Sequence, residues 1–290
     1  MILRCLGTLA LTAFLILPPL TGCKLERPDP ASAAAAILHK HPSDFLSALT
    51  ALDALASAEV GLPAVPWLDL LYRHSSLLKP LLKNAGSDSE KVSILNAWIF
   101  DSLSVVTQPD STHLAGSLPS RVLTSNQGSC LGLTLLYLAL GQTLQLPLRP
   151  VLLPGHIFVR FRSQTYTCNI ETLRRGLARS DDFYRQEFFL DKRPWYTLSD
   201  GDPKQALAAL VFNLANTHRS RGELKYALTE YQLTEEAIPG FPEALANQGA
   251  VLLATGAVKD AEMKLTASLA GDSINTPASK NLARIGEISN

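Results

Sequence analysis

The sequence lacks the signatures of several functional classes. Its 26 basic and 26 acidic residues balance, and no basic stripe stands out, which argues against nucleic acid as a partner. It has neither a phosphate-binding loop nor a dinucleotide fingerprint, so we expect no cofactor. Five of the six histidines are scattered without the spacing of metal ligands, and we expect no metal site: His39, His41, His74, His113 and His218.

Cysteine is scarce as well, and two of the four cysteines lie in an N-terminal segment that we expect to be removed or modified. Residues 1–22 begin with a positive charge at Arg4, followed by an apolar run that is too short for a stable membrane span, which predicts a secretory signal peptide. Cys5 would leave with this peptide. The segment ends in Leu20-Thr21-Gly22-Cys23.

That ending resembles the bacterial lipobox, and the resemblance implies cleavage before Cys23 followed by acylation of this residue. Several acyl chains would give stable membrane anchoring where one would not. An ordinary secretory signal with an incidental cysteine is the alternative. Residues 23–33 read as a Pro-rich tether without regular structure. We therefore expect a bacterial envelope protein that faces the periplasm. An aspartate after the acylated cysteine often retains lipoproteins at an inner membrane, and this chain has Lys24 there, which favours the outer membrane.

The body of the chain predicts a mainly helical, α+β protein, because it is rich in Ala and Leu and only 18% of its residues are charged. Helical patterns fill the N-terminal part, and an extended loop is expected over 107–126. A buried helix at 130–145 is then followed by short strands at 148–153, 157–161 and 166–170. This order predicts a buried helix packed on a small antiparallel sheet.

The C-terminal third contains two segments that match at a period of 34 residues. Small residues and glycines recur in register, as in the pairs Ala215 with Gly249 and Gly222 with Gly256. The match resembles two tetratricopeptide repeats, at 208–241 and 242–275. A plain helical hairpin domain is the alternative reading.

Cys130 carries the strongest functional signal. It follows a tight turn at the start of the buried helix, where the helix dipole favours an ionised thiol. His156 follows 26 residues later, just before a strand, and Asn169 follows 13 residues after that. A thiol, an imidazole and a polar group that orients the imidazole form the set that a cysteine nucleophile needs. A disulfide between Cys130 and Cys168 is the competing reading, because the envelope can be oxidising.

Four segments around these residues resemble the transglutaminase-like superfamily, over about 92–187. They are Gly128-Ser129-Cys130-Leu131-Gly132-Leu133, Leu136-Tyr137-Leu138-Ala139, Leu153-Pro154-Gly155-His156-Ile157-Phe158-Val159-Arg160-Phe161 and Asn169-Ile170-Glu171-Thr172. The resemblance implies a papain-like core with Cys130 as the nucleophile and His156 as the base. Together these patterns divide the chain into four parts. They are a lipoprotein signal peptide at 1–22, a tether at 23–33, a transglutaminase-like domain at 34–200 with a helical N-terminal part, and a repeat domain at 204–290.

The third catalytic position is open between two residues. Members of the superfamily often have aspartate where this chain has Asn169, and an asparagine carbonyl can still accept the imidazole N–H. Glu171 lies on the same face of an extended strand and is the alternative. The backbone N–H of Cys130 is one candidate oxyanion donor, and Gln127 could supply a second.

A small basic cluster follows the third position, at Arg174, Arg175 and Arg179. It reads either as a solvated surface or as a site that recognises acidic groups near the cleft.

Two functions remain open at this point. The first is a membrane-anchored cysteine hydrolase or acyltransferase that acts on amide bonds of a protein or peptide through a thioester, with the repeats recruiting a protein partner. The second is an inactive lipoprotein adaptor that binds proteins through its repeats.

Overall fold

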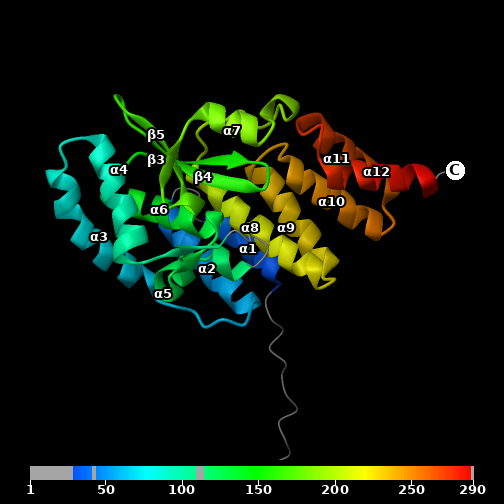
Figure 1. The fold of residues 1–290 in the computed structure, drawn as a ribbon. Helices are drawn as coiled ribbons and strands as arrows, with labels where there is room; N and C mark the ends of the chain where they lie inside the picture. Colours follow the sequence, from blue (N-terminus) through cyan, green and yellow to red (C-terminus); the bar gives the residue numbers. More distant parts are fainter. Residues whose placement is uncertain (1–28, 41–43, 109–113, 289–290) are drawn as a thin grey trace, which may run out of the picture.

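The computed structural model describes residues 29–40, 44–108 and 114–288 (Figure 1). The predicted signal peptide, Cys23 and most of the expected tether lie outside these residues. Within the described part, no helix is both long enough and apolar enough to cross a membrane.

The described part of the chain starts with four helices. They are α1 (Pro30–Lys40), α2 (Phe45–Glu59), α3 (Trp67–Asn84) and α4 (Asp88–Ala97). Helix α1 takes in the last residues of the segment 23–33, where we expected an irregular tether. Pro30 is compatible with a first helical position, and the Asp29 carboxylate accepts the backbone N–H of Ala31 at 3.1 Å. Helix α4 begins as its capping pattern predicts, with Ser87 Oγ accepting the N–H of Glu90 at 3.1 Å.

The segment 107–126 is more regular than the sequence indicates. It holds a 3-10 turn at Leu114–Ser117 and helix α5 (Pro119–Ser125), and it is followed by strand β2 (Gln127–Gly128), which pairs in parallel with β1 (Val106–Thr107). Pro119 occupies the first turn of α5, where proline is favoured, so the expectation of an extended loop is wrong for this part of the segment.

The central layer is a four-stranded antiparallel sheet in the order β3 (Leu148–Leu153), β4 (His156–Arg162), β5 (Thr167–Glu171) and β6 (Leu177–Arg179). Helix α6 (Cys130–Leu144) packs on one face, where Val159, Phe161, Cys168 and Ile170 join its core. The opposite face meets helix α7 (Asp181–Glu187) through the stacked rings of Phe158 and Tyr184, whose centroids are 4.2 Å apart. The predicted buried helix on a small antiparallel sheet is confirmed, and β6 is an additional strand.

The C-terminal part forms two helical hairpins and a final helix, seen in yellow to red in Figure 1. The helices are α8 (Pro203–Ser220), α9 (Leu224–Ala237), α10 (Pro242–Ala254), α11 (Val258–Gly271) and α12 (Thr276–Ile288). Gly222 and Gly256 occupy the turn of each hairpin with φ of +77° and +83°, where a residue with a Cβ would be strained. At Gly249 an added Cβ would lie 2.5 Å from Leu265 Cγ, so this glycine lets α10 and α11 pack closely.

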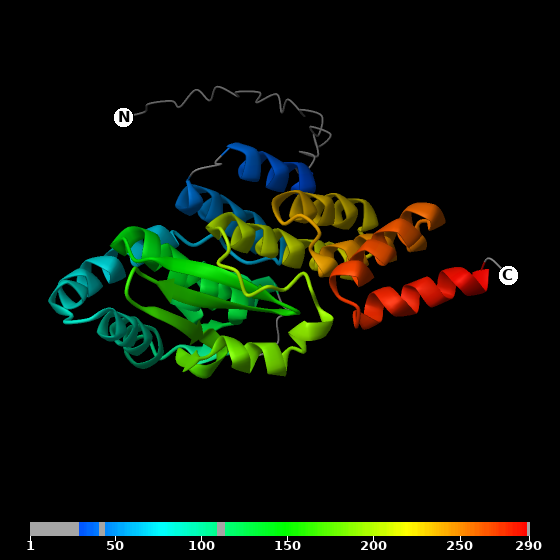
Figure 2. The ribbon, with the colours of Figure 1, turned by 90° about the horizontal axis from the view of Figure 1, so that it is seen from above.

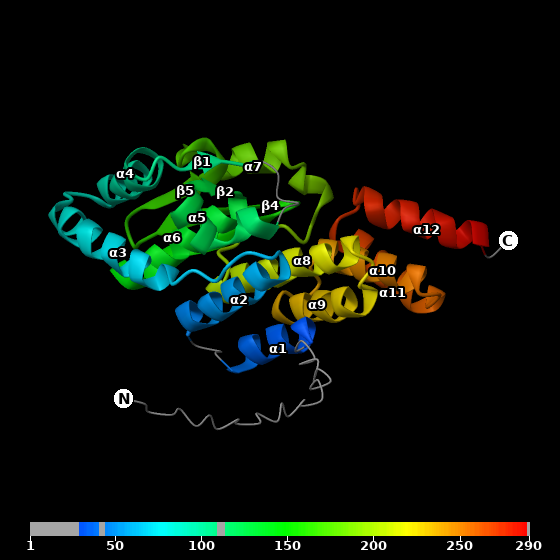
Figure 3. The same cartoon turned by 90° about the horizontal axis from the view of Figure 1, so that it is seen from below.

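Helix α8 connects the two halves, because it contacts α6 and β3 on one side and α9 on the other. The N-terminal helices complete this layer, with α2 beside α8 and α1 beside α9 (Figure 3). Helix α12 extends away from the sheet at the far end of the hairpins (Figure 2). Helix α6 contacts α8, and the N–H of Gly155 in the β3–β4 turn bonds to Glu243 of α10. The start of α6 and the β3–β4 turn thus face the helical hairpins.

Candidate active site

Cys130 is the first residue of α6, and the local sequence fixes it there. Ser129 caps the helix, with its Oγ accepting the N–H of Gly132 at 3.4 Å, and its own N–H bonds to the carbonyl of Gly116 at 2.9 Å. A Cβ at position 132 would lie 2.3 Å from that same carbonyl, so only glycine allows this approach. Cys130 is 5% exposed, and it lies in the first helical turn, where backbone N–H groups have no acceptor four residues earlier within the helix.

His156 is brought to Cys130 by a tight hairpin turn. Strands β3 and β4 pair from Leu153 opposite His156, and only Pro154 and Gly155 lie between them. Gly155 has a φ of +63°, which suits the residue after proline in a type II turn. The turn places His156 at the start of β4, where its ring stacks on Phe188 with centroids 5.7 Å apart.

Glu171 is the residue that holds the imidazole. Its Oε2 lies 2.9 Å from His156 Nε2 and also accepts the hydroxyl of Tyr184 at 3.0 Å. Its Oε1 accepts the backbone N–H of Leu173 at 3.0 Å. With Nε2 engaged by the carboxylate, Nδ1 is the ring nitrogen available to the Cys130 thiol.

Asn169, which the sequence analysis favoured for this position, lies elsewhere, and the assignment is corrected here. It pairs across the strands with Arg160, whose Nε donates to Asn169 Oδ1 at 2.6 Å. Its Nδ2 donates to the carbonyl of Arg179 at 3.0 Å and to Asp181 Oδ1 at 2.7 Å. Asn169 and Glu171 do share a face of β5, but the strand register sets Glu171 nearer to His156.

The electrostatics of the pair favour a charged imidazole. Burial lowers the pKa of His156, but the hydrogen bonds and negative charges of Cys130 and Glu171 outweigh it and raise the pKa to about 9. Burial also raises the pKa of Glu171, and the interaction with His156 together with the N–H of Leu173 and the hydroxyl of Tyr184 brings it below its ordinary value. The imidazole is thus suited to take the thiol proton and to keep it near neutral pH.

Gln127 does not line the cleft around Cys130. It lies on strand β2 with its side chain exposed, and its Oε1 accepts the side-chain amide of Gln108 at 2.7 Å. The backbone N–H of Cys130 remains the candidate oxyanion donor at the helix start. Cys168 is a free buried thiol, as is Cys130, and no disulfide joins the two. It lies opposite Phe161 on the face of the sheet that packs on α6.

A cleft of about 150 Å³ opens at Cys130 between the sheet and the helical hairpins. Its walls are mostly apolar, with polar groups at Asn213, Asn216 and Glu243 from the hairpins. Its lining residues are Cys130, Leu131, Leu152, Leu153, Gly155, His156, Ile157, Ala209, Phe212, Asn213, Asn216, Phe241 and Glu243.

Glu243 joins the hairpins to the histidine turn. Its Oε1 accepts the backbone N–H of Gly155 at 3.0 Å, and its Oε2 accepts the hydroxyl of Tyr196. Burial raises the pKa of this carboxyl. Sequence reasoning missed Glu243 as well as Tyr184, because their roles depend on contacts with distant segments. The only signal for Glu243 was an acidic residue in the first turn of a predicted repeat helix.

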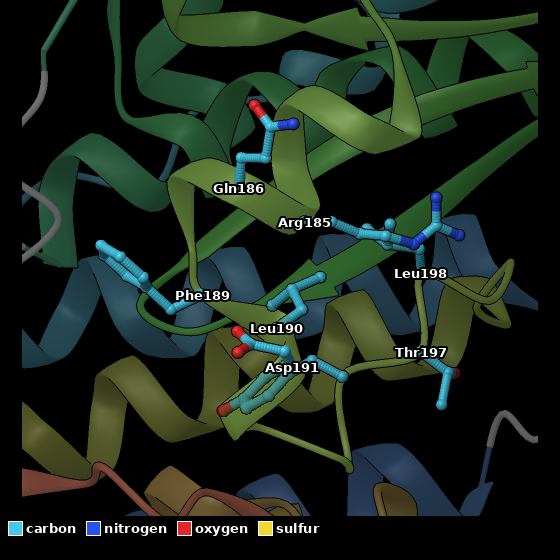
Figure 4. Close-up of a pocket in the computed structure, with 8 residues that line it drawn as sticks. Arg185, Gln186, Phe189, Leu190, Asp191, Thr197 and Leu198 are labelled. Carbon is cyan, nitrogen blue, oxygen red and sulfur yellow. The ribbon is translucent and has the colours of Figure 1, made fainter.

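A larger hollow of about 570 Å³ lies apart from this chemistry. Arg185 and Gln186 of α7 border it together with Phe189 and Leu198, as Figure 4 shows. Neither Cys130 nor His156 lines it. Among the described residues, no group of three or more His, Cys, Asp or Glu side chains could hold a metal ion.

Comparison with known protein families matches residues 66–185 to the transglutaminase-like superfamily, so the likeness begins well before residue 92. Comparison with curated proteins found no match. Among solved structures, the crystal structure of menin, described as revealing the binding site for the Mixed Lineage Leukemia (MLL) protein, is similar with a TM-score of 0.57 and 15% identity. The similarity covers 88% of this chain and 62% of the menin chain, and at this identity it shows the fold alone. Residues 66–185, which hold Cys130, His156 and Glu171, therefore form a transglutaminase-like superfamily domain.

Proposed function

We propose that this protein is a cysteine hydrolase or acyltransferase that acts on amide bonds through a thioester. The observation that carries the proposal is the arrangement of a thiol at a helix start, an imidazole with a pKa raised to about 9 and a buried carboxylate 2.9 Å from that imidazole. These are the nucleophile, the base and the orienting group of cysteine catalysis.

In the proposed reaction, His156 takes the proton of Cys130, and the sulfur attacks the amide carbonyl. The developing oxyanion is stabilised by the N–H of Cys130. The C–N bond breaks as His156 returns its proton to the leaving nitrogen, which leaves a thioester on Cys130. Water then attacks the thioester and releases the acid, or a second amine attacks and forms a new amide, and either step restores the thiol.

The proposal includes a place and a partner for this chemistry. Acylation at Cys23 would hold the protein on a bacterial envelope membrane, with the outer membrane favoured. The two hairpins act as tetratricopeptide repeats that recruit a protein partner or substrate. The Asn213 and Asn216 amides and the apolar wall of the cleft suit a peptide, since amide side chains can bond its backbone while an apolar side chain fills the cleft.

The second candidate function is a catalytically inactive adaptor that binds proteins in the same cleft. The fold similarity to menin, whose structure is described as revealing a binding site for the Mixed Lineage Leukemia protein, favours it. In this case His156 and Glu171 would serve the structure of the binding site.

Labelling of Cys130 with iodoacetamide at pH 7 separates the two functions. The full chain is treated for a series of times, and mass spectrometry of its peptides gives the rate at each cysteine. Cys168 is the internal control, because it is also buried and free, and its thiol donates to the backbone carbonyl of Asn169 rather than facing an imidazole. We expect Cys130 to react much faster than Cys168 and to lose this advantage in His156→Ala. Equal rates at Cys130 and Cys168 would favour the adaptor.

A further inference from the structure

His156 and Glu171 border a second hollow, of about 480 Å³, in which Cys130 takes no part. The other residues around it come from β1, the turn after β5, β6 and the region of α7. They are Thr107, Leu173, Arg174, Arg179, Phe183, Glu187 and Phe188. The imidazole thus separates the cleft at Cys130 from a hollow that contains two members of the basic cluster, Arg174 and Arg179.

The three arginines of that cluster differ in their surroundings. Arg175 turns away and pairs with Asp101, with an N–O distance of 2.5 Å. Among the described residues, Arg174 and Arg179 form no ion pair with a carboxylate. The guanidinium carbon of Arg179 lies 4.5 Å from the ring centroid of Phe183, which holds this side chain in place. The buried Nε of Arg179 has no hydrogen-bond partner among the described residues.

The charge in this hollow is therefore positive. Glu171 is compensated by His156, and among the lining residues the one other carboxylate, Glu187, is exposed, as Arg174 is, so solvent screens both. The partly buried Arg179 supplies the charge that is screened least. A guanidinium held over an aromatic ring loses little freedom when it binds a planar anion, and its fork matches a carboxylate. The hollow suits a small carboxylate better than a neutral or cationic group.

The direction of the proposed reaction says which part of the substrate reaches this hollow. Cys130 binds the acyl carbon, and His156 gives its proton to the leaving nitrogen. The leaving amine therefore lies against the imidazole, which borders both the cleft at Cys130 and the hollow of Arg174 and Arg179, so a group attached to this amine can reach the hollow past the ring. We propose that this hollow binds a carboxylate on the leaving-amine side of an amide substrate, with Arg179 as the main ligand and Arg174 as the second. This inference rests on the proposed function.

The experiment compares alkylation of Cys130 by three iodoacetyl compounds in the full chain. Iodoacetyl-glycine carries a terminal carboxylate, iodoacetyl-glycinamide is its neutral counterpart, and iodoacetyl-aspartic acid α-amide carries the carboxylate on a side chain. The rates are mapped to Cys130 by mass spectrometry at each pH from 6 to 10, so a rate ratio is obtained whether or not the thiol is activated at neutral pH. Ratios of an anionic to the neutral reagent cancel the intrinsic reactivity of the thiol.

We expect at least one anionic reagent to react faster than the neutral one in the native protein. The ratio should fall by about tenfold in Arg174→Gln/Arg179→Gln, the loss expected for a charged hydrogen bond. It should stay unchanged in the matched control Arg175→Gln, because that arginine pairs with Asp101. Thermal melting of each variant verifies that the fold is retained, and Arg179→Lys, which keeps the charge without the fork, should restore part of the ratio.

The pattern of ratios also identifies the source of the carboxylate. Preference for iodoacetyl-glycine indicates a substrate with a terminal carboxylate, and preference for the aspartic acid compound indicates an acidic side chain. A ratio that is the same in the native protein and the double variant overturns the inference, even where Cys130 outpaces Cys168 with the neutral reagent. Slow labelling of Cys130 with a ratio that still depends on the arginines would instead remove the proposed catalysis and retain an anion site.

Discussion

Replacing Glu171 by glutamine tests the most specific feature of the site, the carboxylate that faces His156. The two side chains are only 11% and 8% exposed, so solvent screens their interaction weakly. The increase of the His156 pKa from 6.5 to about 9 corresponds to about 3 kcal/mol in favour of the imidazolium. Burial acts against this increase, so the combined contribution of Cys130 and Glu171 is larger than the net value.

Glu171 contributes both a hydrogen bond and a negative charge to that total, as Cys130 does. An opposite charge in direct contact typically changes a pKa by about 1 to 3. We therefore expect Glu171→Gln to bring the pKa of His156 from about 9 to between roughly 6 and 8.

Nuclear magnetic resonance of the histidine ring protons measures this pKa directly. The signal of His156 is identified by its loss in His156→Ala, and the titration runs from pH 5 to 10.5. Glu187→Gln is the matched control, because Glu187 borders the same hollow but is exposed and its carboxylate does not hold the imidazole. A His156 pKa that moves by the same amount in Glu171→Gln and Glu187→Gln would refute the argument.

The same substitution changes how stability depends on pH. A pKa that is raised in the folded protein stabilises it fully below pH 6.5, and this stabilisation is lost as the pH rises through about 9. Denaturant unfolding should therefore show that Glu171→Gln costs most near pH 6 and little at pH 10. A cost that stays constant from pH 6 to 10 would contradict the charge-based account and indicate a loss of packing alone.

Three further substitutions test the supporting structure. Gly249→Ala should destabilise the hairpins by about 1–3 kcal/mol in thermal melting, because its Cβ would lie 2.5 Å from Leu265 Cγ. Gly286→Ala is the control, because a Cβ there has open space and should not destabilise the protein. Glu230→Ala removes one partner of the buried pair with His218, at 2.7 Å, and should cost about 3–5 kcal/mol in urea unfolding near pH 6. Burial lowers the pKa of His218, but Glu230 and Glu59 raise it above 6.5, so this cost should shrink as the pH rises and the imidazole becomes neutral. Glu243→Ala removes the acceptor of the Gly155 N–H and should slow iodoacetamide labelling of Cys130, whereas Glu243→Gln keeps an acceptor and should restore part of the rate. Equal rates in both variants would show that the contact does not position His156.

The order of chemistry along the chain could be predicted from local pattern, because each signal lies within one element. Ser129 caps a helix, an apolar run continues it, and Pro154-Gly155 marks a tight turn before the strand that begins with His156. These features depend on backbone preferences of a few neighbouring residues. The helix, the hairpin and the two residues that meet at their ends follow from them.

The choice between Asn169 and Glu171 could not be made in the same way. Both side chains lie on one face of β5, so alternation does not distinguish them. The register between β4 and β5 decides, because it sets Asn169 opposite Arg160 and leaves Glu171 toward the start of β4. Register depends on the hairpin that joins these strands and on the packing of both faces, and a single strand sequence does not contain it.

Arg160 explains why the register is the one observed. Its guanidinium is buried, and it is bound by Asn169, by Asp181 and Asp200, and by the carbonyl of Leu198. A buried charge is tolerated only when its donors are paired, and a slip of β5 would take Asn169 away from it. Asn169 thus acts on the site indirectly. By satisfying Arg160 it fixes the strand on which Glu171 faces His156, so Asn169→Ala should weaken folding more than it changes the pKa of His156.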